Sequence, residues 1–95
     1  MTIEQRYEEV PYPGRPLVQA HPDRLATLAR LHGMPAPQPD GSRVLEVGCG
    51  DGANLIPMAC TLGAATFVGI DTSASAIAAA RATAGELGLE NIVFE

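Results

Sequence analysis

The sequence lacks lysine and tryptophan, and its only aromatic residues are two tyrosines and two phenylalanines. The basic residues are six scattered arginines in a chain of formal net charge −5: Arg6, Arg15, Arg24, Arg30, Arg43 and Arg81. Because no basic stripe exists to pair with phosphates, direct nucleic-acid binding by this segment is not expected. Because aromatic side chains are scarce, the core of this 95-residue, single-domain chain should consist of leucine, isoleucine, valine and alanine.

Cysteine is also scarce, which limits disulfide and metal chemistry. Cys49 and Cys60 are the only two cysteines, and a pair of free thiols is typical of a reducing compartment. No cluster of ligands has metal-site spacing, so no metal site is expected. No apolar run is long enough to cross a bilayer, and the polar start "MTIEQRYEEV" is unlike a signal peptide. We therefore expect a cytoplasmic protein without membrane contact.

The first twenty residues show no clear hydrophobic period. The stretch "VPYPGRPL" contains three prolines and a glycine, which exclude a regular helix there. The sequence predicts an extended N-terminal arm over residues 1–20. Two interpretations of this arm stay open: a disordered tail, or a flap that lays Tyr7 or Tyr12 over a ligand.

The next stretch, "HPDRLATLARLHG", predicts a short helix. Pro22 suits a first turn and Asp23 suits the positive end of the helix dipole, while Gly33 is a typical stop. His21 and His32 fall at the two ends and are interpreted as cap or surface residues. "MPAPQPDGS" then predicts a stiff, proline-rich linker over about residues 34–42.

From Arg43 onward the pattern alternates between strands and helices. The predicted strands are "RVLEV", "ATFVGID" and "NIVFE". The predicted helices lie in "CGDGANLIPMACTLG", beginning near Asp51 or Gly52, and in "TSASAIAAARATAGELG". The second of these should be capped by Thr72, Ser73 or Ser75 and buried through Ile77, Ala80, Ala84 and Leu87. Strand–helix–strand–helix–strand with short connections predicts a parallel sheet with right-handed crossovers.

A glycine-rich loop follows the first predicted strand. Gly48 and Gly50 permit backbone angles closed to other residues and let the main chain approach a ligand closely. Asp71 ends the second strand, at the same edge of the sheet, where a carboxylate can accept both hydroxyl groups of a ribose. This combination predicts a nucleoside-containing cofactor. The alternative is a tight glycine turn with Asp71 capping its own helix.

The glycines alone do not choose the cofactor, because residues 48–53 also satisfy the dinucleotide fingerprint G-x-G-x-x-G/A. The carboxylates discriminate better. A dinucleotide would bring its pyrophosphate close to Asp51, with Glu46 lowering the potential further, and such repulsion costs of order several kcal/mol in a partly desolvated site. S-adenosylmethionine instead carries a sulfonium and an ammonium, which this loop would attract. Glu46 has a structural alternative, as an acid that ties down the loop.

Three stretches resemble the class I S-adenosylmethionine-dependent methyltransferases. "LEVGCGDGAN" resembles the first motif of that family, "VGIDTS" resembles the second, and "NIVFE" resembles the strand before the third. The stretch "HPDRLATLARLHGMPAP" is also similar to a bacterial subgroup that carries a methyltransferase regulatory domain. The resemblance implies an α/β, Rossmann-like three-layer sandwich with a parallel sheet. Residues 21–95 would form its N-terminal half, truncated to the first three strands in the order 3-2-1 with an N-terminal helix.

The resemblance also implies roles for individual residues. Asp71 would hold the ribose, Thr72 would lie near the adenine, and Asn54 would help to order the loop. Glu46, Gly48, Gly50 and Gly52 would line the methionine part. Cys49 and Asp51 complete the set of predicted cofactor-binding residues. The family takes its catalytic groups largely from later strands, so no catalytic residue is assigned here and those groups are expected beyond Glu95.

Three functions are therefore weighed. The first is the cofactor-binding half of a methyltransferase, which would turn S-adenosylmethionine into S-adenosylhomocysteine with an acceptor that the sequence does not identify. The others are an NAD(P)-binding oxidoreductase fragment and a non-catalytic interaction domain that retains the fold. In the implied strand order the first strand becomes an open apolar edge, so we also expect self-association through that edge.

Overall fold

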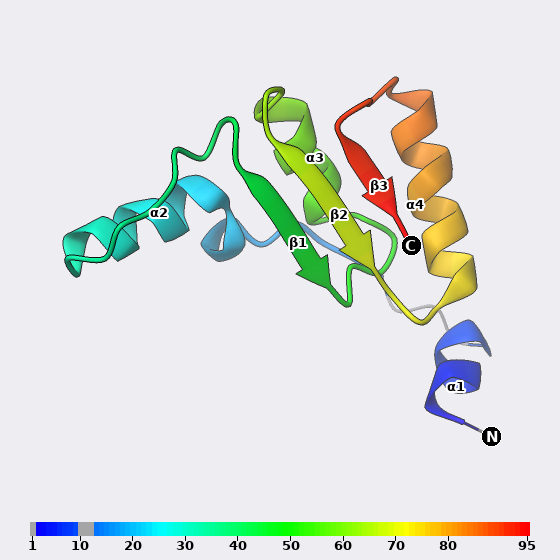
Figure 1. Ribbon diagram of the computed structural model, residues 1–95. Coiled ribbons are helices and arrows are strands. Elements are labelled where there is room, and N and C mark those ends of the chain that lie inside the picture. Colours follow the sequence, from blue (N-terminus) through cyan, green and yellow to red (C-terminus); the bar gives the residue numbers. More distant parts are fainter. Residues whose placement is uncertain (1, 10–12) are drawn as a thin grey trace.

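The computed structural model describes residues 2–9 and 13–95 (Figure 1). The elements in chain order are α1 (Ile3–Glu9), the 3-10 helix η1 (Val18–Ala20), α2 (Pro22–Leu31), β1 (Arg43–Val47), α3 (Leu55–Thr61), β2 (Thr66–Ile70), α4 (Ala74–Glu86) and β3 (Ile92–Phe94). The predicted alternation of strands and helices after Arg43 is confirmed.

The three strands form one parallel sheet in the order β1-β2-β3. Leu45 pairs with Val68, which pairs with Val93, so these three side chains share one face. This is the predicted arrangement of strands, and the Rossmann-like α/β fold, limited to three strands and preceded by the helix α2, is confirmed. β1 forms one edge of this sheet in the part of the chain that the structure describes.

The core lies on one face of the sheet only. Phe67 of β2 and Phe94 of β3 point toward α3 and α4, and both are almost completely buried. α3 contributes Leu55, and α4 contributes Ile77 and Ala80. Both crossovers run in the same direction across the sheet, and right-handed crossovers then place both helices on the same side.

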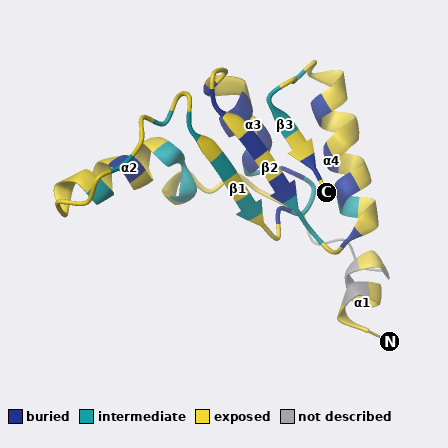
Figure 2. Cartoon of the chain, viewed as in Figure 1, coloured by how far each residue is buried: buried dark blue, intermediate teal, exposed yellow. Residues whose placement is uncertain are grey.

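The other face of the sheet is uncovered by the described residues. Leu45 is 61% exposed, Val47 74%, Val68 37% and Val93 52%. Figure 2 shows this as alternating yellow and teal along β1, without the dark blue of the core. Strands of a parallel sheet are usually covered on both faces, but among the described residues α3 and α4 cover only one face of this sheet.

α3 begins later than the sequence predicted. Its first residue is Leu55 rather than Asp51 or Gly52, because residues 51–54 form a turn that closes the glycine loop. Pro57 consequently lies in the first turn of α3. Amides there have no partner within the helix, so proline removes no helical hydrogen bond.

α4 is capped by Ser73, whose Oγ accepts from the Ala76 amide at 3.2 Å. Ile77, Ala80 and Ala84 are buried as predicted. Leu87 is 55% exposed, so the prediction that it is buried is wrong. The helix ends at Glu86 and the chain turns at Gly88, after which Leu89 packs against the core in place of Leu87.

The expected extended arm is wrong for its first part, because Ile3–Glu9 is helical. Thr2 and Gln5 form a reciprocal capping box: the Thr2 amide donates to Gln5 Oε1 at 2.8 Å, and the Gln5 amide donates to Thr2 Oγ1 at 3.2 Å. Residues 13–17 have no regular structure. Tyr12 and the side chain of Tyr7 lie outside what the structure describes, so the predicted flap over a ligand remains a prediction.

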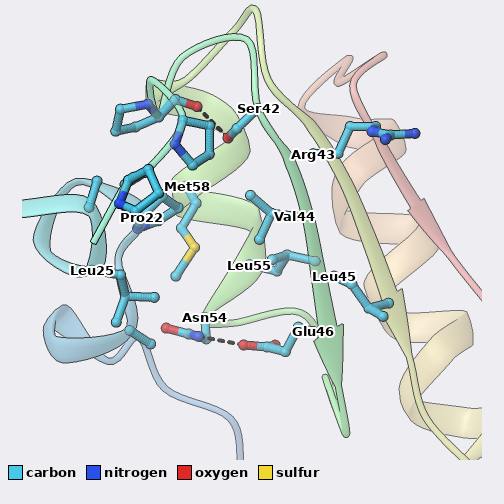
Figure 3. Close-up of a pocket in the computed structure, with 16 residues that line it drawn as sticks. Pro22, Leu25, Ser42, Arg43, Val44, Leu45, Glu46, Asn54, Leu55 and Met58 are labelled. Atoms are coloured by element: carbon cyan, nitrogen blue, oxygen red, sulfur yellow. Dashed lines mark hydrogen bonds between the residues drawn. The ribbon is translucent and has the colours of Figure 1, made fainter. Parts of the chain in front are cut away.

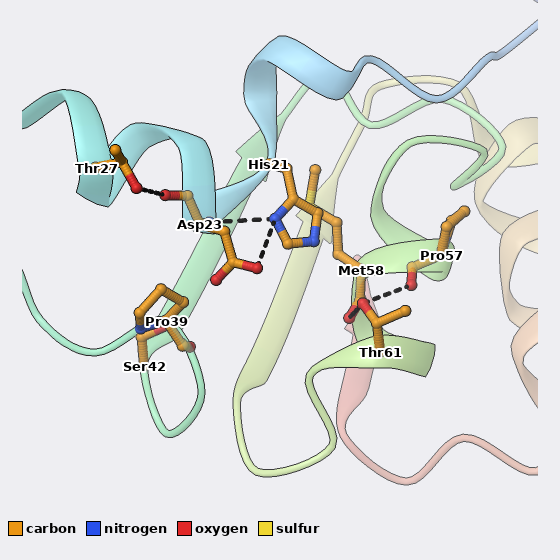
Figure 4. Close-up of polar contacts among 8 residues, drawn as sticks. All are labelled: His21, Asp23, Thr27, Pro39, Ser42, Pro57, Met58 and Thr61. Atoms are coloured by element: carbon orange, nitrogen blue, oxygen red, sulfur yellow. Dashed lines mark hydrogen bonds and ion pairs between the residues drawn. The ribbon is translucent and has the colours of Figure 1, made fainter.

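α2 begins and ends as predicted, with His21 as N-cap and His32 as C-cap. Figure 4 shows the Asp23 amide donating to His21 Nδ1 at 3.1 Å and Thr27 Oγ1 donating to the Asp23 carbonyl at 2.8 Å. Residues 34–42 contain no helix or strand. Within residues 2–9 and 13–95, no helix has the length and apolarity to cross a membrane, and no group of three acidic, histidine or cysteine side chains is placed to hold a metal.

Candidate functional site

The candidate site lies at the carboxyl ends of β1 and β2, where the glycine loop, residues 48–52, meets the β2–α4 connection. The amides of Gly48 and Cys49 both donate to the Ile70 carbonyl, at 2.8 and 3.0 Å. The Gly50 amide donates to Asp71 Oδ2 at 2.8 Å. Two loops that are about twenty residues apart in the sequence are thereby fixed against each other.

The three glycines of the loop all have positive φ angles, of 75° at Gly48, 57° at Gly50 and 82° at Gly52. Gly52 has a second reason to be glycine. A Cβ atom there would lie 2.8 Å from Ile56 Cδ1 and 2.9 Å from Phe94 Cζ. The loop is therefore pressed directly onto the core, which gives its backbone a fixed position.

The loop amides are turned inward. Besides the three amides described above, the Gly52 amide donates to the Cys49 carbonyl at 3.1 Å and the Ala53 amide donates to Asp51 Oδ1 at 3.1 Å. A loop that cradles a phosphate presents its amide groups to the ligand. Here four of the loop's five amides, and the Ala53 amide next to them, already donate to carbonyl and carboxylate oxygens of the protein itself.

Three carboxylates of the site act on the pKa of the Cys49 thiol. Cys49 is 6% exposed, with its side chain under Gly69, where an added Cβ would lie 2.9 Å from the Cys49 sulfur. Burial raises the pKa of Cys49 to about 11, and the nearby carboxylates of Asp71, Glu46 and Asp51 contribute to the rise. Three carboxylates thus act on one buried atom, as expected for a site that attracts a cation.

Glu46, from β1, is paired rather than isolated. Its Oε2 accepts a short hydrogen bond from the side-chain amide of Asn54, which immediately precedes α3. Figure 3 shows this pair at the lower end of a groove of about 510 Å³ between α2 and β1. Apolar side chains line most of this groove, among them Leu25, Val44 and Met58. The pair meets the condition that a half-buried carboxylate needs a partner.

Asp71 has a structural role in addition to any contact with a ligand. Its Oδ2 accepts from Gly50, and its Oδ1 accepts from the Ser73 amide at 2.9 Å. The second of these bonds is a local turn just before α4. The cap of α4 is Ser73, so the alternative interpretation, in which Asp71 caps its own helix, is wrong. Each carboxylate oxygen keeps a second lone pair, so the same group can still accept from hydroxyl groups.

The structure brings most of the predicted site residues to this one edge of the sheet: Glu46, Gly48, Gly50, Asp51, Gly52, Asn54 and Asp71. Cys49 lies there too, but its buried side chain points into the core, so only its main chain faces the loop. Thr72 is exposed and follows Asp71 along the chain. The roles of these residues toward a cofactor remain predictions.

The sequence left open whether the N-terminal arm reaches a ligand, and it did not reveal that Gly14 and Leu17 contact this site. A Cβ added at Gly14 would collide with the Asp51 carboxylate and lie 2.9 Å from Ala53 Cβ. The Leu17 amide donates to Asn54 Oδ1 at 2.7 Å. Farther out, the Ser75 amide lies 3.3 Å from Glu8 Oε1, and hydrogen bonds from Ser75 and Ser73 lower the pKa of Glu8. No periodic pattern marks such contacts in the sequence.

Comparison with known proteins agrees with this geometry. A family model described as a methyltransferase domain matches residues 38–95. An uncharacterized protein of Rickettsia prowazekii is 46% identical over 88 residues, which cover 93% of this chain. The solved structure of PKMT2 from Rickettsia typhi in complex with AdoHcy has a TM-score of 0.84 and 29% identity over 90% of this chain. A SAM-dependent methyltransferase from Geobacter sulfurreducens, in complex with S-adenosyl-L-homocysteine, has a TM-score of 0.60 and 26% identity over all of this chain.

These proteins are much longer than the region of similarity. The chain spans 16% of the R. prowazekii protein, 17% of PKMT2 and 36% of the G. sulfurreducens enzyme. The family model, in contrast, covers more than half of this chain, including β1, the glycine loop and Asp71. The chain therefore belongs to the methyltransferase domain family.

Proposed function

We propose that this chain is the cofactor-binding part of an S-adenosylmethionine-dependent methyltransferase, with S-adenosylhomocysteine as the product that leaves the same site. Family membership supports this, as do the two similar structures that contain S-adenosylhomocysteine. The observation that carries the proposal is the chemistry of the site: most loop amides donate to oxygens of the protein itself, and the carboxylates of Asp71, Glu46 and Asp51 all raise the pKa of Cys49. A sulfonium compound fits that potential, whereas a pyrophosphate would meet like charge.

The residues divide into three groups in this proposal. The main chain at Gly48, Gly50 and Gly52 permits close approach of the methionine part, and Glu46 and Asp51 supply negative charge beside it. Asp71 accepts from the ribose hydroxyl groups, with Thr72 near the adenine. The chain supplies no catalytic residue in this scheme, because methyl transfer depends on aligning an acceptor with the sulfonium methyl group. The acceptor and the groups that align it are assigned to no residue here.

Titration calorimetry with S-adenosylhomocysteine, NAD and NADP tests the proposal. The chain should bind S-adenosylhomocysteine and neither dinucleotide. Asp71→Ala should weaken that binding, and Asp40→Ala is a matched control. Asp40 also accepts a backbone amide, from Ala64 at 2.9 Å, but lies in the linker away from the loop. Preference for a dinucleotide would favour the oxidoreductase alternative, and failure of all three ligands to bind would favour the non-catalytic interaction domain.

The proposal also includes self-association and location. The uncovered edge and face of β1, with Leu45 and Val47 exposed, support pairing with a second copy of the chain. Sedimentation should show a concentration-dependent dimer, and a monodisperse monomer at all concentrations would overturn this part.

Two free thiols, Cys49 and Cys60, support a cytoplasmic location.

A further inference from the structure

Asn54 joins two parts of the molecule that no sequence motif connects. Its side-chain nitrogen donates to Glu46 Oε2 on β1, and its Oδ1 accepts from the Leu17 amide at 2.7 Å. The two partners fix which way the side-chain amide points. In the flipped orientation an NH2 group would face an N–H group, and an oxygen would face a carboxylate.

Residues 13–17 also contact the glycine loop at a second point. Gly14 lies so close to Asp51 that even a methyl group on it would overlap the carboxylate. The φ angle of Gly14 is not positive, so close approach rather than backbone conformation is the reason for glycine here. This segment is thus held at Gly14, against Asp51 in the loop, and at Leu17, through Asn54 just after the loop.

From this geometry we propose that Asn54 is a positioning residue that couples the seating of residues 13–17 to the orientation of Glu46, and hence to cofactor affinity. The identity of the ligand rests on the proposed function. The coupling through Leu17, Asn54 and Glu46, called the relay below, does not. When Leu17 is seated, Asn54 is held with its NH2 group toward Glu46, which fixes the carboxylate beside the loop. Because coupling between two sites is reciprocal, the bound cofactor must stabilise the seated segment by the same factor.

In the relay Asn54 donates and Glu46 accepts, and substitutions can exchange these two roles. Asn54→Asp keeps an acceptor for Leu17 but sets a carboxylate against Glu46, which repels it. Adding Glu46→Gln restores a donor–acceptor pair in the opposite sense, since the glutamine NH2 group can donate to the new carboxylate. The double variant has the same net charge as the wild-type chain. A residue that only fills space would not show such rescue.

Amide hydrogen exchange at Leu17, followed by NMR on the 95-residue chain, reads the relay directly. Asn54→Asp should speed Leu17 exchange about tenfold, because repulsion from Glu46 turns the new carboxylate away from its position beside the Leu17 amide. The double variant with Glu46→Gln removes that repulsion and should return exchange toward the wild-type rate. Gly14→Ala should also speed exchange, by lifting the segment off Asp51. Gln19→Ala is the control, because Gln19 is exposed in η1 and outside the relay. Unchanged Leu17 exchange in Asn54→Asp and Gly14→Ala would overturn the relay.

Affinity for S-adenosylhomocysteine supplies the second readout. Asn54→Asp and Gly14→Ala should each weaken binding at least about fivefold, and saturating ligand should slow Leu17 exchange in the wild-type chain. If the wild-type chain binds but these variants keep full affinity, the coupling is wrong while the proposed function stands. If the wild-type chain does not bind, the proposed function fails, and the exchange pattern without ligand still decides whether the relay exists.

Discussion

Two regions of the sheet differ in how far their groups find partners within the chain: the carboxyl ends of β1 and β2, and the face opposite α3 and α4. At the carboxyl end, four amides of the glycine loop and the Ala53 amide have partners within the chain, as do one oxygen each of Glu46 and Asp51 and both oxygens of Asp71. On the uncovered face, Leu45, Val47, Val68 and Val93 remain exposed. Most polar groups of the candidate site thus have hydrogen-bond partners within the chain, while the apolar face of the sheet that holds the site is not covered by the described residues.

The difference shows which structural features a short stretch of sequence can determine without contacts from the rest of the molecule. A glycine loop and an aspartate one strand away make their hydrogen bonds without help from other regions. An apolar face can be buried only by another surface, whatever the sequence of its own strands. Substitutions at the carboxyl end should therefore affect folding and ligand binding, whereas substitutions on the uncovered face should affect association.

Gly52→Ala should have the largest effect. It combines a positive φ of 82° with overlap against Ile56 and Phe94, and the two penalties together should cost about 3 kcal/mol of unfolding free energy. Gly63→Ala is the control, since its Cβ meets open space and should change stability by less than about 0.5 kcal/mol. Urea denaturation measures both. Equal stability of the two variants would show that the loop is not pressed onto the core.

Asp71→Ala should have the next largest effect. It removes the acceptor for the amides of Gly50 and Ser73, and should cost about 2 kcal/mol of unfolding free energy. The control Asp40→Ala, which removes one exposed acceptor, should cost about 1 kcal/mol or less. A loss in Asp71→Ala no larger than in Asp40→Ala would mean that the carboxyl end is not the better-bonded region.

The same contrast explains which predictions from the sequence succeeded. β1 was predicted at its observed bounds, and Ser73 was among the predicted caps, because hydrophobic pattern and capping chemistry act over a few residues. The predicted start of α3 was wrong, because the turn at residues 51–54 depends on hydrogen bonds between the glycine loop and the end of β2. The helix α1 was missed although Thr2 and Gln5 have capping-box spacing, since the prolines that follow dominated the interpretation.

The contacts between the site and residues 13–17 could not be predicted from the sequence, for a different reason. Nothing in the sequence says that Gly14 would lie on Asp51, or that the Leu17 amide would find Asn54 thirty-seven residues later. A single glycine between a proline and an arginine is typical of many turns. Only the folded path of residues 13–17 across the glycine loop gives it a specific role.

Val47→Lys tests the uncovered side, with an effect on association rather than folding. A lysine on an exposed edge strand opposes pairing with another strand, so self-association should weaken at least about tenfold. Leu31→Lys is matched in exposure, at 75% against 74%, but lies on α2 and should leave association unchanged. Sedimentation at several concentrations measures the difference. Equal association of both variants would place the contact elsewhere.

The smallest expected effect concerns the charge around Cys49. In a Cys60→Ser background, Cys49 should react with iodoacetamide with a midpoint near pH 11, and Asp71→Asn should lower that midpoint only partly, because burial is the larger cause. The raised pKa also sets a stability trend: the unfolded thiol ionises first, near its ordinary value of 9.0, so stability is complete below that pH and falls as pH rises toward 11. Cys49→Ala in the same background should remove this fall. If the midpoint is unchanged by Asp71→Asn, the carboxyl end is buried but not negative, and the preference for a sulfonium over a pyrophosphate loses its electrostatic basis.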